Sequence, residues 1–158
     1  MKITFICIGK TTQPFLVAGE QEYLKRLTFY CKLDRIELPD LKNSKNMQRD
    51  QIKKEEGKMF LSRIDSNDYV ILLDERGKQY GSIEFAKFIE DRQMEGTRNI
   101  VFIVGGAFGF SDEIYQRANG MLSLSKMTFS HQMIRMLFFE QLYRAHTIIR
   151  KEPYHHAD

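Results

Sequence analysis

The strongest constraint on the fold is an alternation of short, continuously apolar segments with longer segments of helical periodicity. The apolar segments are typical of strands buried on both faces, and the segments between them repeat apolar residues every three to four positions. This order favours a mainly parallel sheet with helices on both faces, an α/β fold. The 158 residues contain no linker, repeat or low-complexity segment, so we expect one domain spanning residues 1–158.

The expected elements follow one another in regular order. We expect strands at residues 2–8, 32–38, 69–74, 99–106 and 121–125. We expect helices at residues 14–29, 47–64, 82–95, 111–118 and 131–150. In sheets of this kind, ligands bind at the carboxyl ends of the strands. Those ends hold Leu73-Asp74-Glu75, Val104-Gly105-Gly106 and the segment SKMTFSH at 125–131.

Composition excludes several classes of protein. No apolar run approaches the roughly 18 to 20 residues that a membrane helix needs, and the N-terminal apolar run stops at Gly9, too short for a signal peptide. We therefore expect a cytoplasmic protein without a membrane partner. Cys7 and Cys31 lie in apolar, strand-like surroundings without CxxC or HxxxH, which favours reduced thiols and no metal. The net charge of +3 fits a polyanionic partner or an ordinary solvated surface.

A glycine-rich turn follows the strand expected at residues 99–106. It reads IVGGAFGFSDE at 103–113, with Ser111 placed to cap a helix that has acidic residues in its first turn. It matches neither GxGxxG nor a P-loop. The glycines either let backbone N–H groups approach a ligand or simply permit a tight turn.

A second polar segment follows the strand expected at residues 69–74. It reads LLDERGK at 72–78, so Asp74 and Glu75 come directly after buried residues. These carboxylates either contact a ligand or solvate a loop that turns at Gly77.

The segment at 121–131 places hydroxyls and a histidine between apolar residues. Ser130 is positioned to cap the last helix, but this accounts for only one hydroxyl. Irregular backbone among apolar residues must satisfy its own buried N–H and C=O groups, and a bound ligand with a polar edge would do so.

The last helix has a wide apolar face, which indicates a central core helix or a dimer interface. Arg135 and Arg144 then remain to contact an anion or to pair with Glu140. After the helix, the tail at 150–158 is either a disordered terminus or a functional segment, and its Tyr, His and Arg favour function.

Several motifs together carry a family resemblance. They are the opening MKITFICIGK, the GG-x-x-G turn, S-x-MTF-x-H-x-x-x-R, EQ-x-YRA and the terminal PYH. With them the chain resembles the SPOUT-class ribosomal RNA large-subunit methyltransferase H family over essentially its whole length. One departure is Ser130, where relatives often have proline.

The resemblance implies a fold and a cofactor that composition does not show. It implies the α/β-knot fold, with a trefoil knot near the C-terminus, and a homodimer. The segment 121–131 would be the knotted loop around the adenine of S-adenosylmethionine. The implied cofactor contacts are Leu73, Gly105, Leu124, Ser125, Lys126, Met127, Thr128 and Phe129.

The resemblance also implies a reaction, methylation of N3 of a pseudouridine in helix 69 of 23S rRNA on the assembled 70S ribosome. The N3 proton must be lost, so a base or an anion stabiliser is needed. The candidate catalytic residues are His155, aided by Tyr154 and Arg150, and then His131. We expect the tail to reach the cofactor of the partner subunit. Phosphate contacts are expected from basic residues such as Lys10, Lys25, Arg26 and Lys126.

Three other functions are compatible with parts of the sequence. One is a non-catalytic RNA- or ribosome-binding protein on a similar scaffold, which would bind no cofactor. Another is a hydrolase that uses His131 with a serine, although no G-x-S-x-G motif or orienting carboxylate supports it. The third is a SPOUT methyltransferase acting on tRNA. The absence of an appended RNA-binding domain and the PYH tail favour the ribosomal substrate.

Overall fold

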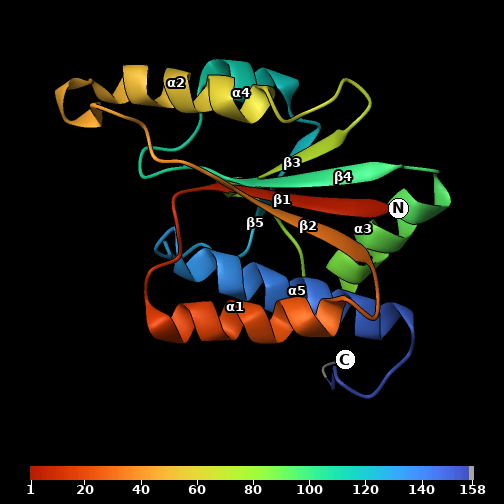
Figure 1. Cartoon of the computed structure of the whole chain (residues 1–158). Helices are drawn as coiled ribbons and strands as arrows, with labels where there is room; N and C mark the ends of the chain where they lie inside the picture. The colour runs from red at the N-terminus through yellow and green to blue at the C-terminus, as the bar shows by residue number, and fades with distance from the viewer. Residues whose placement is uncertain (157–158) are drawn as a thin grey trace.

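The fold was analysed in a computed structural model that describes residues 1–156, so the last two residues of the predicted domain lie outside the described part. Strands and helices alternate as predicted (Figure 1). The strands are β1 (Lys2–Ile8), β2 (Lys32–Leu38), β3 (Tyr69–Gln79), β4 (Asn99–Val104) and β5 (Gly120–Ser123). The helices are α1 (Pro14–Leu27), a 3₁₀ turn (Ser44–Asn46), α2 (Arg49–Leu61), α3 (Ser82–Met94), α4 (Asp112–Arg117) and α5 (Met133–Ile149).

The strands form one sheet in the order β2-β1-β4-β3-β5, and every neighbouring pair is parallel. This confirms the predicted α/β fold with a mainly parallel sheet. Because the strands are parallel, their carboxyl ends meet at one edge, and the loops that follow β3, β4 and β5 start side by side. The predicted trefoil knot concerns the path of the chain rather than its strand pairing, and it remains a prediction.

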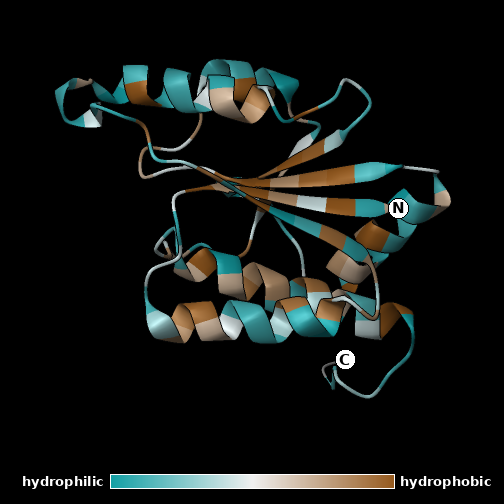
Figure 2. Cartoon of the chain, viewed as in Figure 1, coloured by the Kyte–Doolittle hydropathy of each residue, from teal (hydrophilic) through white to brown (hydrophobic). Residues whose placement is uncertain are grey.

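Two hydrophobic cores explain why the strands are continuously apolar. Figure 1 shows α1, α3 and α5 on one face of the sheet and α2 and α4 on the other. In β1, Phe5 packs into the first core, whereas Ile6 packs into the second. Successive side chains of a strand point to opposite faces, so burying both faces requires apolar residues throughout. Figure 2 shows the result, with mainly hydrophobic strands between helices in which hydrophilic and hydrophobic residues alternate.

Strand β3 differs from its prediction, since it continues beyond residue 74 to Gln79. Leu73 and Lys78 both pair with Leu122 of β5, so the four residues between them bulge out of the ladder. A Cβ on Gly77 would lie 2.7 Å from the backbone nitrogen of Leu122. Only glycine lets the two backbones approach so closely, and the bulge pushes Asp74 and Glu75 out at the carboxyl edge.

Other boundaries shift by one to three residues, for local reasons. Helix α5 begins at Met133 rather than at 131, after a turn at residues 131–132. The Ser130 hydroxyl accepts a hydrogen bond from the Met133 N–H at 3.1 Å, but the residue at the N-cap position is Gln132, so Ser130 bonds to the first turn without being the cap that was predicted. Within residues 1–156, no helix has the length and apolar character needed to cross a membrane.

Candidate functional site

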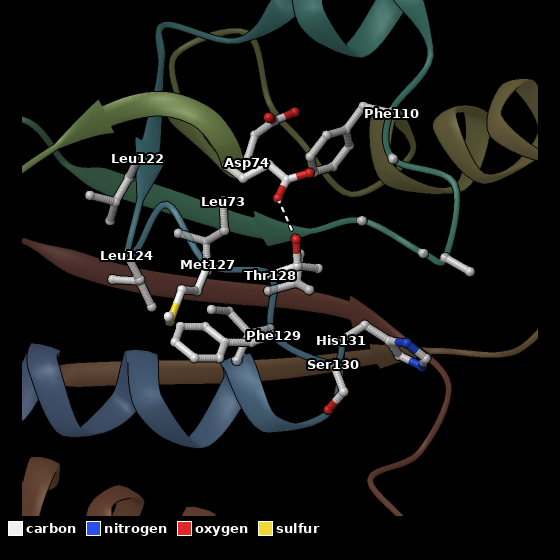
Figure 3. Close-up of a pocket in the computed structure, with 17 residues that line it drawn as sticks. Leu73, Asp74, Phe110, Leu122, Leu124, Met127, Thr128, Phe129, Ser130 and His131 are labelled. Atoms are coloured by element: carbon white, nitrogen blue, oxygen red, sulfur yellow. Dashed lines mark hydrogen bonds between the residues drawn. The ribbon is translucent and has the colours of Figure 1, made fainter.

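One pocket of about 340 Å³ opens at the carboxyl edge of the sheet (Figure 3). The β3 bulge, the turn after β4 and the loop after β5 all line it, so the structure brings the three predicted segments together. The cause lies in the sheet register, where Leu73 pairs with both Val104 and Leu122. Its apolar lining consists of Leu73, Val104, Phe110, Leu122, Leu124, Met127, Phe129 and Ile134.

The glycine turn forms one wall of the pocket. Gly109 adopts a φ of +85° and its N–H donates to the Gly106 carbonyl at 3.2 Å. A Cβ on Gly105 would lie 3.2 Å from the ring of Phe110, so a side chain there would crowd this wall. Ser111 caps α4 as predicted, accepting from the Ile114 N–H at 3.4 Å. The tight turn that was predicted is confirmed, and the turn also lines a cavity, whereas the approach of its backbone N–H groups to a ligand remains a prediction.

A buried carboxyl group of α2 supports this turn from outside the pocket. A Cβ on Gly106 would lie 2.5 Å from Glu56 Oε2, so the carboxylate sits against the turn backbone. Glu56 is 7% exposed, and its Oε1 has no hydrogen-bond partner. Burial, together with the nearby charge of Asp40, raises the pKa of Glu56 to about 7. The sequence analysis missed this residue, although Gly57, a glycine inside a helix, was a signal of close packing there.

The bulge carboxylates face the pocket with different partners. Tyr115 donates its hydroxyl to Asp74 Oδ2 at 2.5 Å, and the Arg76 N–H donates to Asp74 Oδ1 at 2.8 Å. Burial alone would raise the Asp74 pKa, but these hydrogen bonds and the Arg76 charge outweigh it and lower that pKa below its ordinary value. Glu75 accepts from the Thr128 hydroxyl at 2.8 Å, the dashed bond in Figure 3. Asp74 is therefore held as a carboxylate at the pocket edge.

The loop after β5 forms the opposite wall and has no helix or strand at residues 124–130. Of the predicted cofactor contacts, Leu124, Met127, Thr128 and Phe129 line the pocket together with Leu73 and Gly105. Ser125 and Lys126 are not among its lining residues. Ser125 instead shapes the loop, since its hydroxyl accepts from the Met127 N–H at 2.9 Å.

The four candidate catalytic residues lie in two places. His131 lines the pocket (Figure 3). Tyr154 and His155 fold back against the middle of α5, and Arg150 donates to the Phe29 carbonyl at 3.1 Å. Within this single chain, the tail residues do not line the pocket.

The two arginines of α5 behave differently from each other. Arg144 pairs with Glu140 at 2.6 Å, one of the two predicted roles. For Arg135 the prediction of an anion or of Glu140 was wrong. Its guanidinium is 1% exposed and donates to the carbonyls of Ile8, Gly9 and His131. Main-chain acceptors of this kind leave no side-chain pattern in the sequence.

The pocket has the chemistry of a site for a flat ring with polar edges. Apolar side chains cover its walls, and Phe129 offers an aromatic surface. The adjoining backbone at residues 124–130 is irregular, so its N–H and C=O groups are not used up by helix or sheet pairing. Such a cavity can bury an aromatic base and bind its edge by main-chain hydrogen bonds.

Comparison with known proteins agrees with this geometry. A family described as "Predicted SPOUT methyltransferase" matches residues 1–155. The chain is 49% identical over 156 residues to a protein of Christiangramia forsetii named "Ribosomal RNA large subunit methyltransferase H", with 99% of each chain covered. Proteins of the same name from Flavobacterium johnsoniae and Cytophaga hutchinsonii are 48% and 47% identical, and the match covers 99% of this chain in both cases. The chain belongs to the SPOUT methyltransferase family.

Proposed function

We propose that this protein transfers a methyl group from S-adenosylmethionine to N3 of a pseudouridine in helix 69 of 23S rRNA, on the assembled 70S ribosome in the cytoplasm. The observation that carries the proposal is the pocket at the carboxyl edge, in a chain that matches relatives named for ribosomal RNA methylation over 99% of their length. Those names support an rRNA substrate. The particular nucleotide comes from the family resemblance of the sequence.

The residues of the pocket fit S-adenosylmethionine. The volume of about 340 Å³ lies within the roughly 300–1,000 Å³ typical of small-molecule sites. Leu124 and Phe129 would cover the adenine faces, and the irregular backbone at 124–130 would bind its polar edge. The carboxylates of Asp74 and Glu75 lie where a cationic part of the ligand would be stabilised. We therefore assign cofactor binding to this pocket.

The bound cofactor supplies a methyl group made electrophilic by its sulfonium. The protein must hold the uracil ring with N3 in line with the carbon–sulfur bond and must accept the N3 proton as the new bond forms. His131 is the candidate acceptor that this chain itself places at the pocket.

His155 is the other candidate proton acceptor, and its contact with Arg144 occupies one of its ring nitrogens. Arg144 can only donate, so its contact of 3.1 Å with His155 Nδ1 uses the ring lone pair. His155 could accept a proton through Nδ1 only after leaving Arg144. This agrees with a tail that acts in the partner's site and is held on its own helix otherwise.

A homodimer forms part of the proposal. Phe15 and Val17 are exposed at the start of α1, the helix that packs beside α5 on the same face of the sheet. Phe15, the more exposed of the two, would be covered by a second subunit that packs on this face. In a dimer, the tail of one subunit could complete the pocket of the other.

The test is a methyl-transfer assay with S-adenosylmethionine labelled on the methyl group. Assembled ribosomes, large subunits, free 23S rRNA and tRNA, all from cells lacking the protein, are offered in parallel. Label on one nucleotide of 23S rRNA, strongest in assembled ribosomes, is the expected result. The control variant is Leu124→Arg, which places a charge in the pocket and should abolish methyl transfer. Its thermal unfolding temperature shows whether it still folds. Label on tRNA would show that tRNA, and not rRNA, is the substrate. Cofactor binding without transfer to any of these RNAs would reject the rRNA assignment. A protein that binds no cofactor would favour the non-catalytic alternative.

A further inference from the structure

A second cavity adjoins the pocket on the outer side of the glycine turn. This flanking groove, of about 490 Å³, lies between the start of α2, the β3 bulge and the turn, and Tyr115 of α4 closes it. It shares Asp74, Glu75, Ala107 and Gly109 with the pocket, so the two cavities adjoin at the turn. An RNA strand whose target base approaches a cofactor in the pocket would therefore have a neighbouring nucleotide close to the groove.

Two pairs of an arginine and an aromatic ring line the flanking groove. The Arg49 guanidinium lies 4.9 Å from the centre of the Phe108 ring, and the Arg76 guanidinium lies 4.9 Å from the centre of the Tyr115 ring. Phe108 is 41% exposed and the Arg76 side chain 68% exposed, so both offer free surface. Exposed aromatic rings and guanidinium planes are the groups on which proteins stack unpaired RNA bases.

The groove also contains three carboxylates, Asp50, Asp74 and Glu75, and two of them have a cationic partner in the protein. Asp74 is held by Tyr115 and Arg76, and Asp50 lies 3.5 Å from Lys53. Glu75 accepts from Thr128 on the pocket side. Arg49, in contrast, forms no ion pair with any residue in 1–156. One cation thus stays available beside the exposed ring.

We propose that the flanking groove binds single-stranded RNA next to the methylated nucleotide, with a base stacked on Phe108 and the adjoining phosphate bound by Arg49. This deepens the proposed rRNA methylation and rests on it.

The first test compares Phe108→Ala and Arg49→Ala with the wild type in methyl transfer to ribosomes. Losing one base stack should raise the KM for ribosomes roughly tenfold, with kcat and cofactor affinity nearly unchanged. Arg49→Ala should also raise this KM and should reduce the slope of log affinity against log salt by about one. Phe108→Trp should preserve the wild-type KM, because it keeps a stacking surface.

The matched control is Lys58→Ala, on the same helix and outside the groove. Lys58 is exposed and pairs with Glu55 at 3.1 Å, so its loss should leave KM and the salt slope as in the wild type. Equal KM values for Phe108→Ala and the wild type would overturn the proposal that the flanking groove binds RNA. A wild type that labels no RNA would reject the methylation itself, and cosedimentation of each variant with ribosomes would then decide the groove independently.

A second test maps the contact directly. A photoreactive benzoylphenylalanine replaces Phe108, and the protein is irradiated on ribosomes in the presence of the cofactor. We expect a crosslink to a nucleotide adjacent to the methylated one. The same group at Met94, which is exposed on α3 across the sheet, should give none there. Crosslinks from position 108 to protein only, or to distant RNA, would contradict the proposal.

Discussion

The two ends of α5 are both held by an arginine, yet in opposite ways. At the pocket end, Arg135 is buried and its donors bind three main-chain carbonyls, which ties the loop before α5 to the end of β1. At the tail end, the Arg144 side chain is 25% exposed and binds Glu140 and His155, with Tyr154 stacked on it.

This difference separates a fixed region from a releasable one. The Ile8 carbonyl is buried and that of Gly9 half-buried, so removing their donor costs much of the desolvation of these groups. Partly exposed ion pairs exchange for water at a cost of about 0–1 kcal/mol. The pocket end is therefore built as a rigid part of the fold, and the tail end is held weakly enough for the movement to a second subunit that we propose.

The largest effect is expected from Arg135→Met. The substitution keeps the length and helix propensity of the side chain but leaves the carbonyls of Ile8 and Gly9 without their donor. We expect the free energy of unfolding to fall by about 2–5 kcal/mol, since each carbonyl left without a donor costs about 1–3 kcal/mol; urea denaturation followed by circular dichroism measures it. A loss below about 1 kcal/mol would mean that water replaces the guanidinium, and the pocket end would then be no more rigid than the tail.

The next effect concerns catalysis at the tail end. If His155 is the proton acceptor, as we propose, His155→Ala should lower kcat by about 100-fold, roughly 2.7 kcal/mol of barrier. The thermal unfolding temperature should hardly change, since the side chain is only partly buried. Single-turnover methyl transfer measures the step. His131→Ala is the comparison at the pocket end, and a larger loss there would assign proton transfer to the pocket residue.

The pocket end also contains a carboxyl group whose protonation should be visible in stability. The pKa of Glu56 is raised from an ordinary 4.5 to about 7, so the folded state binds the proton more tightly than the unfolded chain. The stabilisation is present below the unfolded pKa and is lost as pH rises toward and through about 7. Glu56→Gln should remove this loss of stability at high pH, because the amide does not ionise.

We expect Glu56→Gln to be more stable than the wild type at pH 8 by up to roughly 3 kcal/mol, and nearly equal to it near pH 4.5. Urea denaturation at both pH values measures the difference. Glu55→Gln, on the exposed side of the same helix, is the matched control and should change stability little. A constant difference between Glu56→Gln and the wild type across this range would show that Glu56 does not titrate there.

Sequence patterns predicted most of the architecture, because they report burial. Apolar runs located all five strands, and their parallel arrangement placed Leu73, Gly105 and the loop after β5 at one edge. The bulge in β3 could not be predicted, since it depends on the approach of Gly77 to Leu122, which lies on a different strand. The strand order β2-β1-β4-β3-β5 likewise depends on contacts between distant segments.

The site was predicted in part for the same reason. Hydroxyls and glycines among apolar residues marked the walls of the pocket. The residues that pack behind those walls were missed. Arg135 donates to main-chain carbonyls and Glu56 packs against the backbone of a glycine, so neither has a partner side chain that the sequence could reveal. The position of the tail depends on hydrogen bonds of Tyr154 to Glu140 and of Arg144 to His155, whose strength sequence alone does not give.

The smallest effect is expected from Arg144→Met, the counterpart of Arg135→Met on the same helix. It removes the pair with Glu140 and the stack on Tyr154, both partly exposed, so the free energy of unfolding should fall by only about 0.5–1 kcal/mol. The tail should become more accessible, seen as faster carboxypeptidase trimming of the folded protein. Glu22→Gln, which breaks a similar i,i+4 pair with Arg26 on α1, should match it in stability but leave trimming unchanged. If Arg144→Met were as destabilising as Arg135→Met, the tail would be a fixed part of the fold, and its transfer to a partner subunit would need another source of energy.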